Sequence, residues 1–266
     1  MSDQDDAKKL VDAFAAAPTC PSVWPHLDRA KIAAGLKVRI DDPDKIDQAG
    51  TSLCGPADFA RDVAKDKPVE YAKAVIDLFK TGMALIGTFA IKPCGDLRKY
   101  SIIGSVDPAD WILLASIRDT DNWFFDYQAE SDDVAAITMP HSKESWLKRA
   151  GYTEVINETN ILASKNKANA ARASDLFDRG YKVALLINSK MLFATPTPKE
   201  PSRSMYSSSL TPDHWVALTS DIEFDSETVE FQVYSWGDGR RKVPESGVLT
   251  QSSFLNNYYG FIACRR

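Results

Sequence analysis

Apolar residues recur at helical spacing through the first two thirds of the chain. Residues 5–17 form an alanine-rich amphipathic segment that stops at Pro18, and Asp28 is placed to cap a short helix that ends near Gly35. The same spacing predicts further helices, which start at Cys54, at Pro68 (with Gly82 as the C-terminal cap), at Pro108 (with Asp107 as the N-cap), and over 142–150 and 168–179.

From Lys182 onward the pattern changes to that of strands. Apolar runs cover 182–188, 214–222, 228–237 and 259–264, and Asp238-Gly239 is typical of a hairpin turn. Residues 195–212 are rich in Pro, Ser and Thr and predict a long surface loop. Helices followed by strands predict an α+β fold in which the helices and an antiparallel sheet are segregated.

Composition narrows the classes of function. The 266 residues are 44% apolar and 26% charged, as in ordinary globular proteins, and the net charge of -5 argues against a nucleic-acid partner. No window approaches eighteen apolar residues, so we expect no membrane span. The acidic start MSDQDD is unlike a secretory signal, and we expect a product made in the cytoplasm.

Cysteine and histidine are too sparse to build a disulfide framework or a metal site. The four cysteines are scattered, no pair has metal-ligand spacing, and the chain has three histidines. The glycine-rich phosphate-binding motifs and HExxH are absent. We therefore expect no metal and no cofactor, and interpret three of the cysteines as structural or incidental: Cys20, Cys94 and Cys264.

Cys54 differs from the other cysteines in its surroundings. A loop rich in Asp, Pro and Gly (41–52) precedes it and Gly55-Pro56 follows, so Cys54 is expected at a helix N-terminus, where the thiolate is stabilised. A lone cysteine is more often a small buried hydrophobe, but this polar setting favours a nucleophile. His214, at the start of an apolar strand, is the best-placed imidazole to activate it.

Three short segments in chain order resemble the papain-like cysteine peptidases. They are Gln48-Ala-Gly-Thr-Ser-Leu-Cys54, Asp213-His214-Trp-Val-Ala-Leu and Tyr234-Ser-Trp-Gly237. The resemblance implies that Cys54 and His214 are catalytic, that Gln48 donates a hydrogen bond to the oxyanion, and that Trp236 shields the site.

The resemblance also implies one papain-like catalytic domain over residues 1–266. Within it we expect an N-terminal helical extension (1–47), a mainly helical subdomain (48–180) and an antiparallel sheet subdomain (181–266), with the active site at their seam.

The residue that orients the histidine departs from the family pattern. Tyr234 replaces the family's asparagine and is too long for the same hydrogen bond. Alternation along a strand puts Asp238 on the face of Tyr234, so Asp238 is the candidate third catalytic residue. The alternative is that Asp238 is an ordinary Asp-Gly turn residue.

Residues 107–123 carry a second group of polar side chains. Asp110, Arg118, Asp119 and Asn122 can line a cleft, but a capped core helix is the simpler interpretation and the one we favour. We expect the following tryptophans in the core: Trp111, Trp215 and Trp236.

These features predict a cysteine-nucleophile amide hydrolase acting on a protein or peptide. The LCGPA and HWV segments are similar to bacterial papain-fold effectors and toxins, which implies signal-independent export and a cognate immunity protein. The alternatives are a deamidase or transglutaminase, cleavage of peptidoglycan cross-bridges, and an inactive binding module, for which Tyr234 is the best argument.

Overall fold

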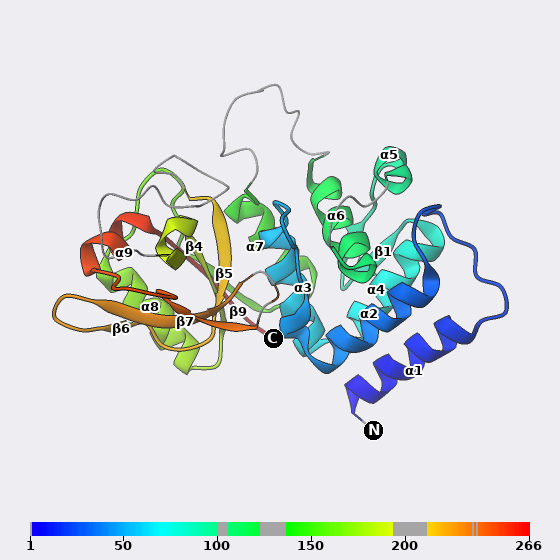
Figure 1. Cartoon of the computed structure of the whole chain (residues 1–266), viewed down its shortest axis with the longest axis horizontal. Coiled ribbons are helices and arrows are strands. Elements are labelled where there is room, and N and C mark those ends of the chain that lie inside the picture. The colour runs from blue at the N-terminus through cyan, green and yellow to red at the C-terminus, as the bar shows by residue number, and fades with distance from the viewer. Residues whose placement is uncertain (1, 101–105, 123–136, 194–211, 236, 238) are drawn as a thin grey trace. The chain divides into compact units, whose positions relative to one another are not determined.

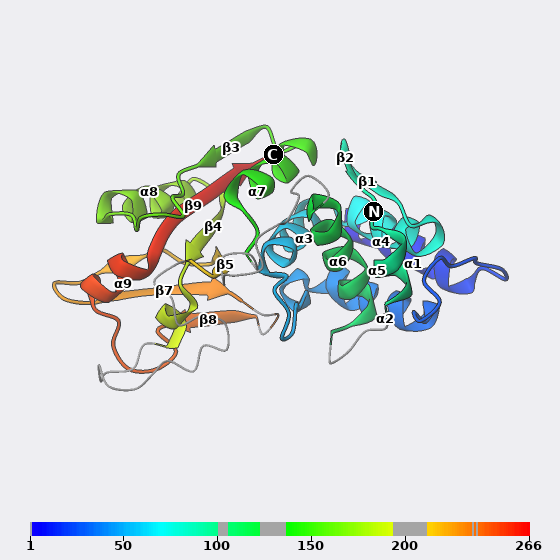
Figure 2. The same cartoon turned by 90° about the horizontal axis from the view of Figure 1, so that it is seen from above.

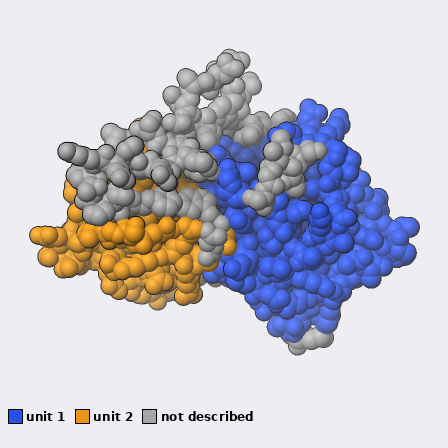
Figure 3. All heavy atoms as spheres, in the orientation of Figure 1, with its two compact units in different colours: residues 1–128, 149–151 blue, residues 129–148, 152–266 orange. Residues whose placement is uncertain are grey.

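A computed structural model describes the chain except residues 1, 101–105, 123–136, 194–211, 236 and 238. The fold is α+β, with a helical N-terminal part and a seven-stranded antiparallel sheet toward the C-terminus, as predicted. The chain divides into two compact units (Figure 3): unit 1 is residues 1–128 with 149–151, and unit 2 is residues 129–148 with 152–266.

Unit 1 is a helical cluster with one small hairpin (Figure 1). Helix α4 packs against α1, α3 and α6, and α2 packs against α1 and α6. The elements of unit 1 are α1 (Asp3–Ala16), α2 (Arg29–Asp41), the 3-10 turn η1 (Pro43–Lys45), α3 (Cys54–Asp66), α4 (Pro68–Thr81), β1 (Ala84–Ile86), β2 (Phe89–Ile91), α5 (Gly95–Lys99) and α6 (Pro108–Asn122).

Most predicted helix ends in unit 1 are correct, and one is wrong. Asp28 caps α2 and Gly82 ends α4 in the left-handed conformation, with φ of 73°. The helix predicted to end near Gly35 instead continues to Asp41. A Cβ on Gly35 would lie 2.4 Å from Asp107 Oδ1, so this glycine permits a close approach between α2 and the start of α6. Gly35 therefore has a packing role and does not end the helix.

A buried ion pair fixes the loop that precedes α3. Arg39 on α2 donates from Nε and Nη2 to both oxygens of Asp110, at 3.1 and 2.7 Å, and from Nη1 to Asp107, at 3.2 Å. The same Asp110 carboxylate accepts the Asp47 backbone N–H at 3.0 Å. Because Asp110 is buried in its helix, its second bond ties the incoming loop to the helical cluster.

Unit 2 is built on the antiparallel sheet, whose strand order is β3-β9-β4-β5-β7-β6, with β8 pairing β7. Figure 2 shows α8 lying along β9. The elements are α7 (Pro140–Arg149, which ends in unit 1), β3 (Glu154–Asn157), α8 (Lys167–Asp178), β4 (Lys182–Ile187), η3 (Ser189–Phe193), β5 (His214–Leu218), β6 (Glu223–Phe224), β7 (Val229–Tyr234), β8 (Arg240–Val243), α9 (Gln251–Asn257) and β9 (Tyr258–Arg265).

The central strands are buried on both faces, which explains their continuous apolar runs. On one face Leu185, Val216 and Val233 join a core with α8 and α9. On the other face Trp215 donates from Nε1 to the Thr138 carbonyl at 2.8 Å, and the Lys143 ammonium lies 4.7 Å from the indole ring. Trp215 is therefore a core residue, as predicted.

One strand prediction needed correction. The run at 214–222 was expected to form one strand, but β5 ends at Leu218 and β6 begins at Glu223, because the chain turns at Ser220, whose hydroxyl accepts the Gln232 N–H at 2.8 Å. Strand β3 lies in the segment 48–180, which is predicted to be mainly helical, and pairs with β9. The predicted loop 195–212 falls almost entirely outside the described residues.

None of the helices that the structure describes is long and apolar enough to cross a membrane.

The Asp110 carboxyl should make the stability of unit 1 depend on pH in an unusual direction. Burial raises its pKa from 3.8 to about 6, although Arg39 opposes the shift. The folded protein then binds a proton that the unfolded chain releases between about pH 4 and pH 6, so this contribution to stability is lost as pH rises. Between about pH 4 and pH 6, the free energy of unfolding of wild type should fall by about 2–3 kcal/mol relative to that of Asp110→Asn.

Urea unfolding, followed by hydrogen exchange of peptides from α2 and α6, reads the transition of unit 1 in the full chain. Asp107→Asn is the matched control, because it keeps Asp110 and should retain the pH dependence of wild type. Parallel stability curves for wild type and Asp110→Asn would refute the assignment.

Candidate functional site

The structure places Cys54 as the first residue of α3, as the sequence predicts. The N-cap residue, Leu53, provides no side-chain hydrogen bond, whereas Ser2, Asp28 and Asn166 cap α1, α2 and α8 in the usual way. The positive end of the α3 dipole is therefore not neutralised by a capping side chain. The Cys54 residue is 6% exposed.

The loop before Cys54 is held by its own short-range hydrogen bonds. The Asp47 carboxylate accepts the Ala49 N–H at 2.7 Å, and the Gln48 carbonyl accepts the Thr51 hydroxyl at 2.6 Å. Ala49 adopts a φ of 50°, which is uncommon for a residue with a Cβ. With the Asp47–Asp110 bond, these contacts define the backbone on both sides of Gln48.

Gln48 is 3% exposed, so its side chain belongs to the interior rather than to a solvated loop. Its Oε1 is buried and has no hydrogen-bond partner among the described residues. A buried amide oxygen without a partner is uncommon in folded proteins. The structure therefore brings Gln48 and Cys54 to the two ends of one fixed loop in unit 1.

His214 begins β5 in unit 2, and a neighbouring carboxylate fixes the start of that strand. Asp213 accepts the Ser189 backbone N–H at 2.6 Å and the Ser189 hydroxyl at 2.9 Å, and donates its own N–H to the Ile187 carbonyl at 3.0 Å. Asp213 thereby ties the beginning of β5 to the end of β4. Burial raises the pKa of its carboxyl.

The imidazole of His214 is held by Ser235. Its Nε2 lies 2.8 Å from Ser235 Oγ, in a buried contact. In the sheet, Ala217 pairs with Tyr234 and Leu218 pairs with Val233. If this register is extended by one residue, Val216 lies opposite Ser235. Because alternate residues share a face, Ser235 is the diagonal neighbour of His214 on the same side of the sheet.

Burial keeps the imidazole neutral near pH 7. His214 is 4% exposed, and desolvation lowers its pKa from 6.5 to about 3, with a smaller contribution from the positive charge of Arg241. Arg241 stands opposite Val233 on β8, and so lies on the same face of the sheet as Ser235. Any positive charge on His214 therefore needs a compensating negative charge nearby.

Ser235, and not Tyr234, lies on the His214 face of the sheet. Tyr234 pairs with Ala217 and lies on the face of Trp215, opposite to that of His214. Counting from Tyr234 in steps of two therefore passes over Ser235. Ser235 is part of the Ser-Trp-Gly segment in the sequence, but the face of the sheet on which it lies depends on the register of β5 and β7. Asp238 and Trp236 lie outside the described residues, so their roles stay predictions.

Helix α6 combines the two interpretations of residues 107–123. Asp107 bonds the Ala109 N–H at 2.8 Å and Asp110 is buried, as a capped core helix requires. Trp111, Arg118 and Asp119, however, line a pocket of unit 1, so Trp111 is not wholly in the core.

Within the described residues, no group of three or more His, Cys, Asp or Glu side chains is placed to hold a metal ion.

Comparison of the chain with protein-family models, with curated proteins and with solved structures found no match.

The His214 imidazole should remain neutral well below the ordinary histidine range. In Cys54→Ser protein, where no thiolate can add its charge, the His214 ring signals in a proton–carbon NMR spectrum should not shift between pH 8 and about pH 5, because burial lowers its pKa to about 3. The signal is assigned by its loss in His214→Gln. A titration midpoint near 6.5 would mean that the ring is solvated.

Proposed function

We propose that the chain is a cysteine-nucleophile amide hydrolase in which Cys54 of unit 1 and His214 of unit 2 share a proton. The observation that carries the proposal is the buried 2.8 Å contact between His214 Nε2 and Ser235 Oγ, at the start of the strand where the sequence predicts a catalytic histidine. An uncapped helix N-terminus at the predicted nucleophile supports it from unit 1.

In this mechanism the thiol proton moves from Cys54 Sγ to His214 Nδ1 as sulfur attacks the amide carbon. The tetrahedral intermediate collapses, the C–N bond breaks, and His214 delivers the proton to the leaving amine. Water then attacks the thioester, and His214 takes its proton and returns it to the sulfur. The Gln48 amide and the Cys54 backbone N–H stabilise the oxyanion, at roughly 3–4 kcal/mol for each donor.

The direction of the His214–Ser235 hydrogen bond decides which ring nitrogen acts as the base. When Nε2–H donates to Ser235 Oγ, the lone pair on Nδ1 accepts the thiol proton. A hydroxyl can also donate to Nε2, and that arrangement would place the proton on Nδ1. Ser235 is therefore a less selective partner than an asparagine carbonyl.

The low pKa of His214 is compatible with this chemistry because proton transfer creates both charges together. An imidazolium alone is costly in a buried site, but a thiolate beside it offsets the charge. The resting pair is then neutral thiol and neutral imidazole, and the ion pair forms on the reaction path. The uncapped α3 N-terminus favours the thiolate in the same step.

The first half-reaction does not distinguish a hydrolase from its nearest alternatives. A thioester formed from a peptide gives a protease, one formed from a glutamine side chain gives a deamidase, and release by an amine gives a transglutaminase. The inactive-module alternative rested on Tyr234. The Ser235 contact weakens it, because the imidazole has an orienting partner without an asparagine.

The biological setting that we propose is that of an exported bacterial effector with an immunity protein in the producing cell. It rests on the similarity of the LCGPA and HWV segments to papain-fold effectors.

Cys54 should be alkylated by iodoacetamide faster than Cys94, although Cys94 is exposed and Cys54 is buried. Removal of the thiol proton by His214 as the sulfur attacks, rather than access, then decides the rate. The apparent pKa of the Cys54 reaction should lie well below about 8.5. His214→Gln should slow the reaction at Cys54 by about tenfold or more and leave Cys94 unchanged. Peptide mapping of the alkylated protein across pH measures each site.

The exposed Cys94 in the same molecules is the internal control for reagent and pH. Ser235→Ala should give a smaller loss than His214→Gln, because it removes the orienting partner and keeps the base. Alkylation of Cys54 that is slower than that of Cys94 at every pH, and unchanged in His214→Gln, would contradict the proposal.

Expression in a bacterial host tests the effector setting. Wild type should slow the growth of the host when it is directed to the compartment that holds its target, either the cytosol or the periplasm. Catalysis continues there because the host has no immunity protein. Cys54→Ala and His214→Gln should both restore growth, whereas Cys94→Ala should remain toxic. Equal growth with wild type and Cys54→Ala in both compartments would remove the support for a toxin.

A further inference from the structure

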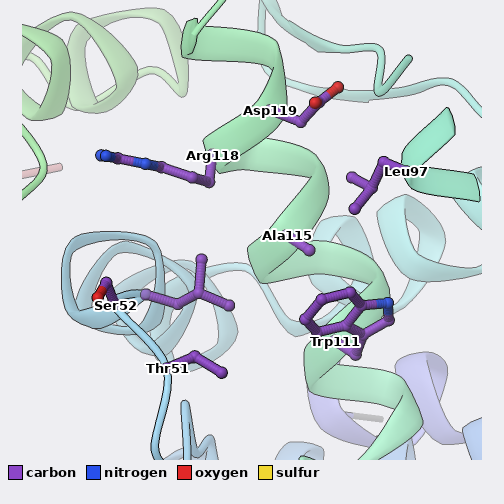
Figure 4. Close-up of a pocket in the computed structure, with 8 residues that line it drawn as sticks. Thr51, Ser52, Leu97, Trp111, Ala115, Arg118 and Asp119 are labelled. Carbon is purple, nitrogen blue, oxygen red and sulfur yellow. The ribbon is translucent and has the colours of Figure 1, made fainter. Parts of the chain in front are cut away.

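A pocket of about 340 Å³ in unit 1 lies against the segment that leads into Cys54 (Figure 4). Thr51, Ser52 and Leu53 form one wall, and Leu53 is bonded directly to Cys54. The opposite wall is a stripe of α6 in which Trp111, Ala115 and Arg118 recur at helical spacing, joined by Leu97 and Asp119. Its volume is near the lower end for ligand sites, about 300–1,000 Å³.

The pocket has an apolar body and two charged groups with different surroundings. Leu53, Leu97, Trp111 and Ala115 supply the apolar surface. The Asp119 carboxylate accepts the Cys94 backbone N–H at 2.6 Å and lies 3.4 Å from its sulfur, so it serves to anchor the start of α5.

Arg118 extends away from Asp119. In Figure 4 the guanidinium lies on the side of α6 that faces Ser52, whereas Asp119 lies on the side of Leu97. The Arg118 side chain is therefore on the side of the chain segment that ends in the nucleophile. A guanidinium with a planar fork of donors is suited to a carboxylate.

We propose that this pocket is the subsite for the residue whose carbonyl Cys54 attacks, and that Arg118 selects a side chain ending in a carboxylate. The inference rests on the proposed function. In an acyl group attached to the Cys54 sulfur, the side chain starts two bonds from the attacked carbon, and the nearest pocket residue in the chain is the adjacent Leu53. The methylene groups of a glutamate would contact Leu53, and its carboxylate would pair with Arg118.

Four electrophiles that differ only in one side chain test this subsite. They are the N-acetyl chloromethyl ketones of glutamate, glutamine, leucine and lysine, which alkylate a nucleophilic thiol: a thioether bond forms and chloride leaves. The rate at Cys54, measured by mass spectrometry on the full chain, should be at least about tenfold higher for glutamate than for lysine, with glutamine between them.

Arg118→Glu should reverse that order, so that the lysine reagent becomes the faster one. Arg118→Gln should bring the glutamate and lysine rates together. The leucine rate should remain within about twofold in both variants, which shows that each variant is folded and that Cys54 is still reactive.

The outcomes separate the subsite from the chemistry. Selective labelling of Cys54 with equal rates for glutamate and lysine, or an order that Arg118→Glu does not change, overturns the subsite and leaves the hydrolase proposal standing. Labelling of Cys54 no faster than that of Cys94 with every reagent overturns the proposed function, and the subsite with it.

Discussion

The cost of placing charge in the interior is the constraint on which this structure depends. His214 is buried at the start of β5, and desolvation holds its ring in the neutral form. A neutral ring bonded to Ser235 through Nε2 becomes a useful base only when a negative charge forms beside it. In the proposed mechanism, the Cys54 thiolate would satisfy this condition as the imidazole takes its proton, because the pair would remain neutral overall.

Unit 1 meets the constraint by pairing its buried charges, and the pairs shape the candidate site. Arg39 and Asp110 neutralise each other, and the remaining capacity of the carboxylate holds Asp47 and the loop around Gln48. On α3 the buried Arg61 bonds Asp44 at 2.7 Å, which ties the helix that begins at Cys54 to the η1 turn. These polar side chains therefore fix the backbone around Gln48 and at the start of α3. The proposed oxyanion site requires such fixed positions for its donors.

Sequence patterns predicted the fold class and the elements on which the candidate residues lie, since helix caps and apolar runs are local. Cys54 at a helix start and His214 at a strand start follow from such signals. Ser235 could not be predicted, because its face depends on the register of two strands. Gly35 was mistaken for a helix end because its reason, a close approach to Asp107, is a tertiary contact. Arg39 and Asp110 lie far apart in the chain, so no local sequence pattern indicates that they pair.

The proposed function requires that Cys54 and His214 share one proton. A crystal structure of the protein alkylated at Cys54 by a small peptide electrophile measures this most directly. In that structure, His214 Nδ1 should lie within about 4 Å of the Cys54 sulfur, and Nε2 should still lie on Ser235 Oγ. A ring nitrogen more than about 7 Å from the sulfur, with another side chain filling that position, would contradict it.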